Sequence, residues 1–295
     1  MLKRRWLALM LCVLVAFVAA GVSGAANTGI LLDPVGDSGS APDITRVEIE
    51  EYSVPLPFGG ASIEFTVTFA QQLACTSDGD GVPMVVAVDT DQNPDTGSAF
   101  YGTEFELAPD AIGDAIFFRA RGWDFRAAPY PEGLSWGCGP HTASYGITAN
   151  ALGLAPGSGF NVVTAVLGPR TDTAPDIRTF NYQPVAGTQP PALGPDRRPP
   201  HLIAYSTEAR RGKVAQLRFW ALDGRGRTAE VIRVYTKTKL LKTIRRPLHD
   251  SNPFVVSSVR WHVPKTVHGR LRFSVDATDA AGNRSVRRWA WLVVR

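Results

Sequence analysis

Apolar and polar side chains alternate strictly between residues 63 and 69 (IEFTVTF), the pattern of a β-strand with one buried face. Other strand-like runs lie at residues 83–88, 104–107, 116–118 and 160–167. Clusters of Gly, Pro, Asp and Asn separate these runs and are typical of turns. Only residues 148–154 suggest a helical turn. Several short strands at this spacing predict a two-sheet β-sandwich in the first half of the chain.

The second half repeats this pattern between residues 201 and 295, with strand-like runs at 214–222, 230–235, 270–277 and 286–294. The stretch before the last run, DATDAAGNRS, resembles a hairpin turn, because Gly282 and Asn283 tolerate positive backbone angles. We therefore predict a second, immunoglobulin-like sandwich and an all-β fold class for the whole chain.

Charge separates the two halves. Residues 26–190 carry 6 basic and 20 acidic side chains, whereas residues 191–295 carry 22 basic and 7 acidic ones. Between them, residues 184–200 contain six prolines, which favours an extended, semi-rigid spacer. We expect a signal peptide at 1–25, an acidic sandwich at 30–183, a proline-rich linker at 184–200 and a basic sandwich at 201–295.

The first residues resemble an export signal. Lys3, Arg4 and Arg5 precede an apolar run that ends near residue 22, followed by small residues. An uncleaved signal anchor is the alternative, since the run is just long enough to span a bilayer. We expect a secreted or cell-surface protein in an oxidising compartment, where Cys75 and Cys138 pair as a disulfide. Closing that loop stabilises a fold by roughly 4 kcal/mol.

A polar loop follows the apolar run at 83–88. Side-chain oxygens stand at every second position, as in the first half of a calcium-binding EF-hand loop, but Pro94 and Phe100 depart from the rest of that motif. A site here must be completed from elsewhere, with Glu104, Glu106 or Asp43 as candidates. The alternative is a polar turn whose side chains bond the backbone. The predicted structural calcium ligands are Asp89, Asp91, Asn93, Asp95 and Glu104.

Aromatic side chains crowd the Gly- and Pro-rich stretch around Cys138. Sugar binding uses flat aromatic rings beside polar groups, so Trp123, Trp136 and Tyr130 are the predicted ligand-binding residues. Packing in the core next to a disulfide is the alternative role for these rings.

Three motifs of the first half together resemble a known family. The stretches DPVGD and APDIT, then VAVDTDQNPDTG, then GTEFEL occur in the order expected of family 9 carbohydrate-binding modules and DOMON-like domains of exported bacterial proteins. The resemblance covers about residues 30–183. It implies a jelly-roll-like sandwich, often calcium-stabilised, that binds sugars or haem. Haem requires an axial ligand, and His141 and Met84 are the only candidates in this half. Met84 falls in the apolar run at 83–88, so haem is disfavoured.

The basic second half suits a partner that is an anionic polymer of the cell envelope. Nucleic acid is disfavoured, because export is expected and no nucleic-acid-binding motif is present. The chain carries no catalytic motif either. We therefore expect a non-catalytic protein that binds a polysaccharide or cell-envelope glycan, or else a structural or adhesive surface protein; a glycan-active hydrolase is a less favoured alternative. The basic residues are Arg210, Arg211, Lys213, Arg225, Arg227, Lys237, Lys239, Lys242, Arg245, Arg246, Arg287 and Arg288.

Overall fold

The structure is a computed structural model of the chain. It describes residues 25–38, 41–54, 60–73, 84–109, 115–121, 124–129, 131, 133–167, 171–176, 178–184, 192–237, 239–251 and 255–295. The predicted signal peptide, apart from its last residue, lies outside the described residues, as do Cys75, Trp123 and Tyr130. Within the described part of the chain, no helix has the length and apolar character needed to cross a membrane.

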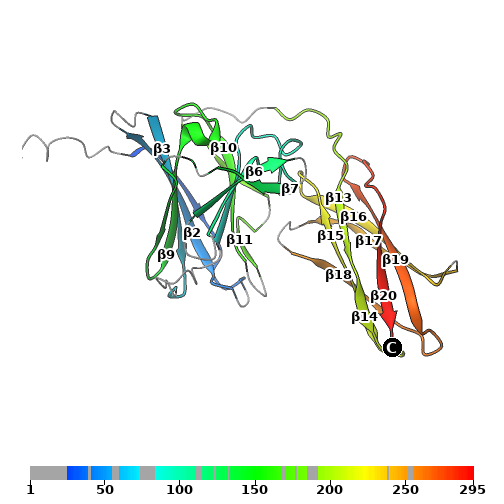
Figure 1. Cartoon of the computed structure of the whole chain (residues 1–295). Helices are drawn as coiled ribbons and strands as arrows, with labels where there is room; N and C mark the ends of the chain where they lie inside the picture. Colours follow the sequence, from blue (N-terminus) through cyan, green and yellow to red (C-terminus); the bar gives the residue numbers. More distant parts are fainter. Residues whose placement is uncertain are drawn as a thin grey trace, which may run out of the picture.

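The chain forms two β-sandwich domains that lie side by side (Figure 1). In the first domain, one sheet has the order β1-β2-β3-β9-β8 and the other has the order β11-β10-β4-β5-β6-β7, with β12 also paired to β10. A 3-10 turn, η1, covers Ala149–Leu152, within the predicted helical turn. The strands are β1 (Ala25–Leu32), β2 (Ile44–Val54), β3 (Gly60–Phe69), β4 (Met84–Asp89), β5 (Phe105–Pro109), β6 (Ala115–Arg121), β7 (Asp124–Ala127), β8 (Ser135–Cys138), β9 (Thr142–Thr148), β10 (Phe160–Val166), β11 (Asp172–Ala174) and β12 (Phe180–Tyr182).

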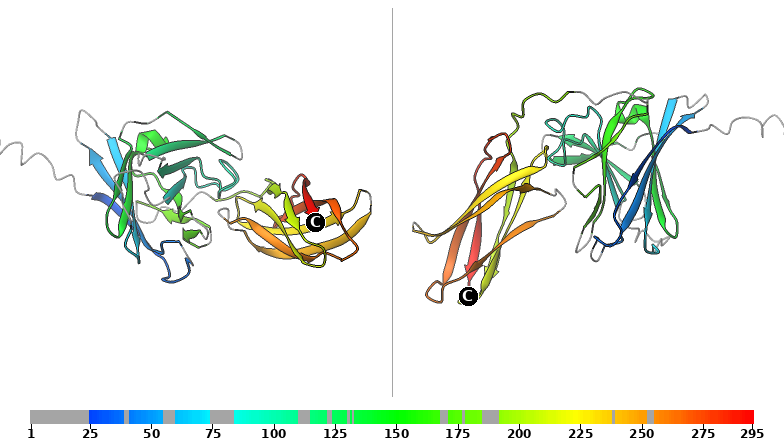
Figure 2. Two further views of the ribbon diagram at one scale, coloured as in Figure 1. Left: turned by 60° about the horizontal axis from the view of Figure 1, so that its bottom comes forward. Right: turned by 180° about the vertical axis from the view of Figure 1, so that it is seen from behind.

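The second domain pairs a three-stranded sheet, β13-β15-β18, with a five-stranded sheet, β14-β20-β19-β16-β17. Strand β14 runs parallel to the last strand, β20, as in immunoglobulin-like sandwiches. Figure 2 shows the two sheets of this domain facing each other. The strands are β13 (His201–Tyr205), β14 (Thr207–Ala209), β15 (Val214–Leu222), β16 (Arg227–Tyr235), β17 (Leu240–Asp250), β18 (Ser257–His262), β19 (Gly269–Asp279) and β20 (Arg288–Val294).

Each sandwich has its own hydrophobic core. Phe65 and Tyr145 are fully buried in the first core, and Phe219 and Phe273 in the second. The alternation at residues 63–69 places every second side chain of β3 inside, as predicted. Because each core draws on two sheets of the same domain, each domain buries its apolar surface independently of the other.

Strand β4 is buried at every position, which explains its uninterrupted apolar sequence. Val86 and Val88 belong to the first core, whereas Ala87 packs with Tyr101 and Val163 on the opposite face of the sheet. The loop that follows β4 therefore folds back over its own sheet and covers the face that the core does not.

The all-β prediction is confirmed, but strands with weak alternation were missed. In β2, Val47 and Ile49 alternate with Glu48 and Glu50, but Glu51 then takes a buried position and interrupts the pattern in sequence. β17 is an edge strand rich in basic residues, a composition that protects sheet edges from further pairing. The last strand begins at Arg288, whereas the sequence pattern predicted residue 286. The hairpin turn before it is present, with Gly282 at a φ of 91°.

Candidate metal-binding loop at the domain junction

The loop between β4 and β5 is tightly folded. Gly97 and Gly102 have positive φ angles of 51° and 79°. A Cβ at Gly97 would lie 2.2 Å from the carbonyl oxygen of Gly102, and a Cβ at Gly102 would lie 2.4 Å from the Cα of Pro94. Only glycine fits at both positions, and this compaction brings the two ends of the loop together.

Three carboxylates meet where the loop closes. Asp89, Asp91 and Glu104 each place one oxygen within 4.8 Å of the other two. The hydroxyl of Thr96 lies 3.0 Å from both carboxylate oxygens of Asp91 and 3.2 Å from Oε1 of Glu104. A hydroxyl donates only one proton, so most of these oxygen pairs are close without a hydrogen bond between them. Hard cations such as Ca²⁺ bind oxygen ligands, and this group supplies several oxygens close together.

Burial makes ionisation of this cluster costly. Asp89 is fully buried, and burial, together with the nearby Glu104 carboxylate, raises its pKa to about 8. Burial also raises the pKa of Glu104. The backbone amide of Thr90 donates to Oε2 of Glu104 at 2.8 Å and holds that carboxylate in place. At neutral pH the cluster therefore favours either a proton or a bound cation.

The other two residues predicted for this site do not join the three carboxylates. The side-chain oxygen of Asn93 accepts a hydrogen bond from the backbone amide of Asp95 at 3.1 Å, and the amide of Asn93 donates to Asp89 and Asp91. Asp95 points to the second domain, where it binds Arg225. Within this loop, a group of three converging carboxylates and a hydrogen-bonded turn thus coexist, each using different polar side chains.

The two alternative residues considered for completing the site also lie elsewhere. Glu106 lines a small hollow with Phe100 and Trp220, and burial raises its pKa to about 7. Asp43 is buried in the β1–β2 connection, where its carboxylate accepts from the amides of Gly36 and Ser38. Glu104 is therefore the carboxylate that the fold brings to Asp89 and Asp91.

The same loop holds the second domain. Arg225, in the turn between β15 and β16, donates from Nε and Nη2 to the two carboxylate oxygens of Asp95 at 2.9 and 2.6 Å. Arg198, near the end of the linker, donates to the carbonyl oxygens of Thr96 and Gly97. These contacts fix one end of the second sandwich on the β4–β5 loop.

The backbones of the two domains also touch. A Cβ at Gly224 would lie 1.7 Å from the carbonyl oxygen of Pro94. Next to this contact, the hydroxyl of Tyr101 donates to the carbonyl oxygen of Ser251 at 3.3 Å, and the rings of Phe100 and Trp220 meet edge to face. The junction is thus a packed interface and not only a pair of ionic contacts.

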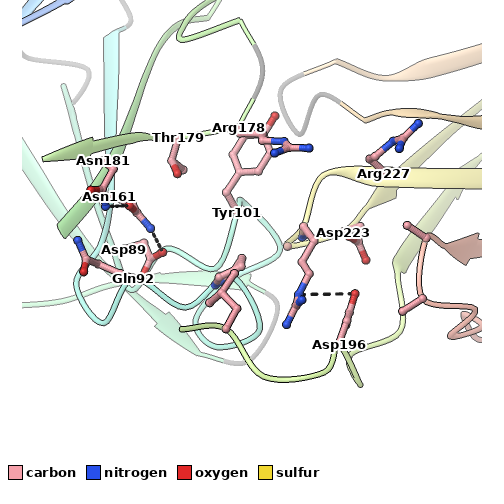
Figure 3. Close-up of a pocket in the computed structure, with 16 residues that line it drawn as sticks. Asp89, Gln92, Tyr101, Asn161, Arg178, Thr179, Asn181, Asp196, Asp223 and Arg227 are labelled. Carbon is pink, nitrogen blue, oxygen red and sulfur yellow. Dashed lines mark hydrogen bonds and ion pairs between the residues drawn. The ribbon is translucent and has the colours of Figure 1, made fainter. Parts of the chain in front are cut away.

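A cavity of about 670 Å³ opens beside this interface. Figure 3 shows Asp89, Asn161 and Asn181 on its first-domain side and Asp196, Asp223 and Arg227 on its second-domain side. The lining is rich in groups that make hydrogen bonds. Gln92 adds a buried side-chain amide nitrogen, Nε2, that has no hydrogen-bond partner among the residues that the structure describes.

A chain of amide side chains supports Asp89. Nδ2 of Asn161 donates to Oδ2 of Asp89 at 2.8 Å, and Nδ2 of Asn181 donates to Oδ1 of Asn161 at 2.7 Å. Gln183 donates to Asn181 in turn. These residues were not among the predicted site residues, although Asn161 and Asn181 are amide side chains within strands of mostly apolar or aromatic residues, a signal that the sequence does carry.

A second acidic cluster lies at the junction. Asp196, Asp223 and Asp279 approach one another as closely as the loop carboxylates do. Here each carboxylate accepts hydrogen bonds: Asp279 and Asp196 from Asn283, and Asp223 from the backbone amide of Arg225. Burial and the other two carboxylates raise the pKa of Asp223 to about 7.

Trp136 is the one predicted sugar-binding residue that the structure describes. Its ring lies 4.6 Å from that of Tyr145, centroid to centroid, and packs on the edge of the first core. Cys138 lies in the same strand. Its expected disulfide partner, Cys75, lies outside the described residues, so that pairing stays a prediction.

The basic residues of the second domain have two kinds of environment. Arg225, Arg246 and Arg287 form ion pairs with Asp95, Glu230 and Asp276. Strands β19 and β20 carry a different arrangement, which we call the Arg–Trp face: Arg270, Arg272, Trp289 and Trp291. The guanidinium of Arg270 lies 3.9 Å from the ring centroid of Trp291, and that of Arg272 lies 4.6 Å from that of Trp289.

No family model matches the chain, and no curated protein matches it. The solved structures that match include the fibronectin(III)-like modules of Clostridium thermocellum CbhA (13% identity, TM-score 0.24, 79% of this chain and 85% of that one). They also include the sialic acid binding region of a Streptococcus sanguinis SK1 adhesin bound to 3'sLn (13%, TM-score 0.26, 79% and 74%). A third is titin domains Z1Z2 in complex with telethonin (12%, TM-score 0.23, 80% and 89%).

Similarity at these TM-scores carries no information about ligand or activity. The class of this protein is defined by its own strands, which build two joined β-sandwich domains in an all-β chain. The resemblance of its first half to family 9 carbohydrate-binding modules and DOMON-like domains stays a prediction, because no family model matches.

Proposed function

We propose that this chain is an exported, non-catalytic binding protein in which a calcium-binding loop fastens two sandwich domains beside a ligand cavity. The observation that carries this proposal is the double role of the β4–β5 loop. Its ends bring together Asp89, Asp91 and Glu104, and its middle binds Arg225 and Arg198 of the second half. A cation at the closing point would therefore stabilise the loop on which the second domain rests.

Calcium suits these ligands better than other common metals. All the converging atoms are oxygens, and Ca²⁺ takes six to eight oxygen ligands in flexible geometry. The three carboxylates would be completed by the Thr96 hydroxyl, backbone carbonyl oxygens or water. Bound Ca²⁺ would also offset the cost of ionising the buried Asp89 carboxylate.

Thermal unfolding tests the metal. The melting temperature of the mature protein is measured with Ca²⁺ and with chelator, for the native sequence and for Asp89→Asn with Asp91→Asn. The proposal expects a calcium-dependent rise that the double variant loses. Asp250→Asn, which alters an acidic side chain in the exposed strand β17, serves as the matched control. Equal melts with and without Ca²⁺ in the native protein would refute the metal.

The cavity is the proposed place for a glycan. Sugar hydroxyls are held by side chains such as Asn, Asp, Gln and Arg, and the lining offers Gln92, Asn181 and Arg178. Binding to a broad panel of cell-envelope polysaccharides is measured by calorimetry. Asn181→Ala should weaken it at least tenfold, and Gln216→Ala, at an exposed position of β15, should leave it unchanged. Binding that survives in Asn181→Ala and Gln92→Ala would place the ligand elsewhere, and Trp136 would then be tested.

The Arg–Trp face favours a second function, adhesion to an anionic envelope polymer. Trp289 and Trp291 are 44% and 42% exposed, so rings and guanidinium groups are both available to a partner. Retention on an anionic polysaccharide resin should fall in Arg270→Ala with Arg272→Ala. Arg218→Ala with Arg260→Ala removes equal charge from the other sheet and should have a smaller effect. Equal losses in the two pairs would show that only net charge matters.

A further inference from the structure

The DPVGD stretch contributes to an acidic cluster that the proposed function does not use. Asp33 directly follows β1, Asp37 lies four residues later, and Asp172 begins β11. Each of these three places one carboxylate oxygen within 4.8 Å of the other two. Among the described residues, no Lys, Arg or His forms an ion pair with any of them.

This cluster is separate from the β4–β5 loop. Strand β10 pairs Asn161 with Asp89 at one end and Val166 with Asp172 at the other. The two acidic clusters therefore lie at opposite ends of the same strand. A ligand bound at one cluster does not contact the other.

One carboxylate oxygen in the cluster is buried and has no partner among the described residues. Asp33 is only 8% exposed, and its Oδ2 is inaccessible to solvent and accepts no hydrogen bond from the part of the chain that the structure describes. A buried carboxylate oxygen without a donor is strongly destabilising. This orphan atom points to a positive charge that none of the described residues supplies.

The surrounding structure holds the cluster in shape. Asp43 is 1% exposed, and its two carboxylate oxygens accept from the backbone amides of Gly36 and Ser38, which fixes the loop that carries Asp33 and Asp37. The amide of Ile44 donates to Oδ2 of Asp172 at 2.6 Å and orients that carboxylate. The acidic side chains are thus positioned by the backbone.

Electrostatics favours a cation of high charge here. Burial and the carboxylates of Asp176, Asp172, Asp37 and Asp43 raise the pKa of Asp33 to about 7. Burial raises the pKa of Asp172 to about 6. These shifts accompany the geometry: several carboxylates repel one another in a partly buried place without any basic neighbour among the described residues.

We propose that Asp33, Asp37 and Asp172 form a second calcium-binding site, distinct from the β4–β5 loop. The orphan Oδ2 of Asp33 would be a direct ligand, with Asp176, backbone carbonyl oxygens or water completing the shell. Oxygen ligands alone favour Ca²⁺ over metals that select nitrogen or sulfur.

The position of the site indicates its effect. β1 is the edge strand of one sheet, and β11 is an edge strand of the other. A cation shared by Asp33, next to β1, and Asp172, in β11, joins the two sheets across one open side of the sandwich. The bound ion would thus restrain the sheets without a covalent crosslink.

Calorimetric titration of Ca²⁺ into the chelator-treated mature protein tests the proposal. The native protein should bind at two sites, and Asp33→Asn with Asp172→Asn should lose one of them. Asp37→Asn, at an exposed side chain, should weaken one site at least tenfold and keeps the test valid if the buried double variant does not fold. Asp250→Asn is the control and should retain both sites.

The outcomes separate this site from the loop site. Suppose that Asp89→Asn with Asp91→Asn removes no calcium site, while Asp33→Asn with Asp172→Asn removes one. The site at Asp33, Asp37 and Asp172 then stands, and the proposal of a calcium site in the β4–β5 loop fails. If Asp33→Asn with Asp172→Asn, and also Asp37→Asn, retain every native calcium site at native affinity, the site at Asp33, Asp37 and Asp172 is refuted. Mg²⁺ should bind at least tenfold more weakly than Ca²⁺, and equal affinity would overturn the assignment to calcium.

Discussion

Arg225 of the second domain and Asp95 of the first are joined by two parallel hydrogen bonds, although 130 residues separate them in sequence. The side chains of this pair are 27% and 22% exposed, so water screens it only in part. The bidentate geometry restrains the orientation of one domain on the other as well as their distance.

Arg225→Ala should loosen the junction. Losing two hydrogen bonds between charged groups costs on the order of 2 kcal/mol, and it leaves Asp95 without its partner. Small-angle scattering should then report a larger radius of gyration, and the second domain should unfold at a lower temperature. Arg295→Ala, which breaks an exposed pair with Glu208, should change neither quantity measurably. An unchanged radius of gyration in Arg225→Ala would contradict the structural role of the pair.

Gly224→Ala tests the backbone contact independently of charge. The added Cβ would meet the carbonyl oxygen of Pro94 at 1.7 Å, so the domains must separate or the turn must move. We expect a larger radius of gyration and a lower melting temperature of the junction. Gly194→Ala, in the linker, meets no atom within 4 Å and should behave as the native protein. If both variants behave alike, the two backbones do not touch in solution.

The acidic cluster at the junction predicts a pH dependence. The pKa of Asp223 is about 7 in the folded protein and near 3.8 in the unfolded chain, so between these values the folded state binds more protons. The free energy of unfolding should therefore fall as pH rises from 4 to 7, by on the order of 2–4 kcal/mol from this group, and then level off. The carboxylates of Asp196 and Asp279 add to the rise in the pKa of Asp223, and hydrogen bonds from the backbone amides of Arg225 and Arg227 oppose it.

Asp223→Asn should remove this part of the pH dependence. The amide oxygen of Asn still accepts from the backbone amide of Arg225, so the turn is retained while the titrating group is lost. Denaturant unfolding of the second domain at pH 4 to 8, in chelator, provides the measurement. Asp250→Asn serves as the control in the same domain. A variant whose stability profile parallels the native one would assign the dependence to other groups.

Trp136→Ala should destabilise the first domain. The ring packs against Tyr145 and the core edge, and truncating a large aromatic ring in such a place costs about 2–4 kcal/mol. Chemical denaturation measures this loss. Trp136→Phe keeps an aromatic ring and should recover about half of it. Native stability in Trp136→Ala, together with lost glycan binding, would instead favour the ligand role predicted from sequence.

Local patterns along the chain were sufficient for the fold class and for part of the loop. Side-chain direction in a strand has a period of two. Strict alternation at residues 63–69 therefore indicates one buried face, and the uninterrupted apolar run before Asp89 indicates that both faces are buried. Oxygen side chains at every second position likewise mark Asp89 and Asp91 in the sequence alone. Charge composition marks the boundary between the two halves.

The tertiary structure alone decided which of these side chains contact one another. Asp95 and Asn93 fit the same sequence pattern as Asp89 and Asp91, yet one binds Arg225 and the other closes a turn. Asp33 meets Asp172 only because β1 and β11 lie on the same side of the sandwich. Such contacts depend on strand order and on the path of distant loops, and spacing along the chain does not encode them. The sequence therefore determined which side chains were available, and the packing of the sheets determined which of them meet.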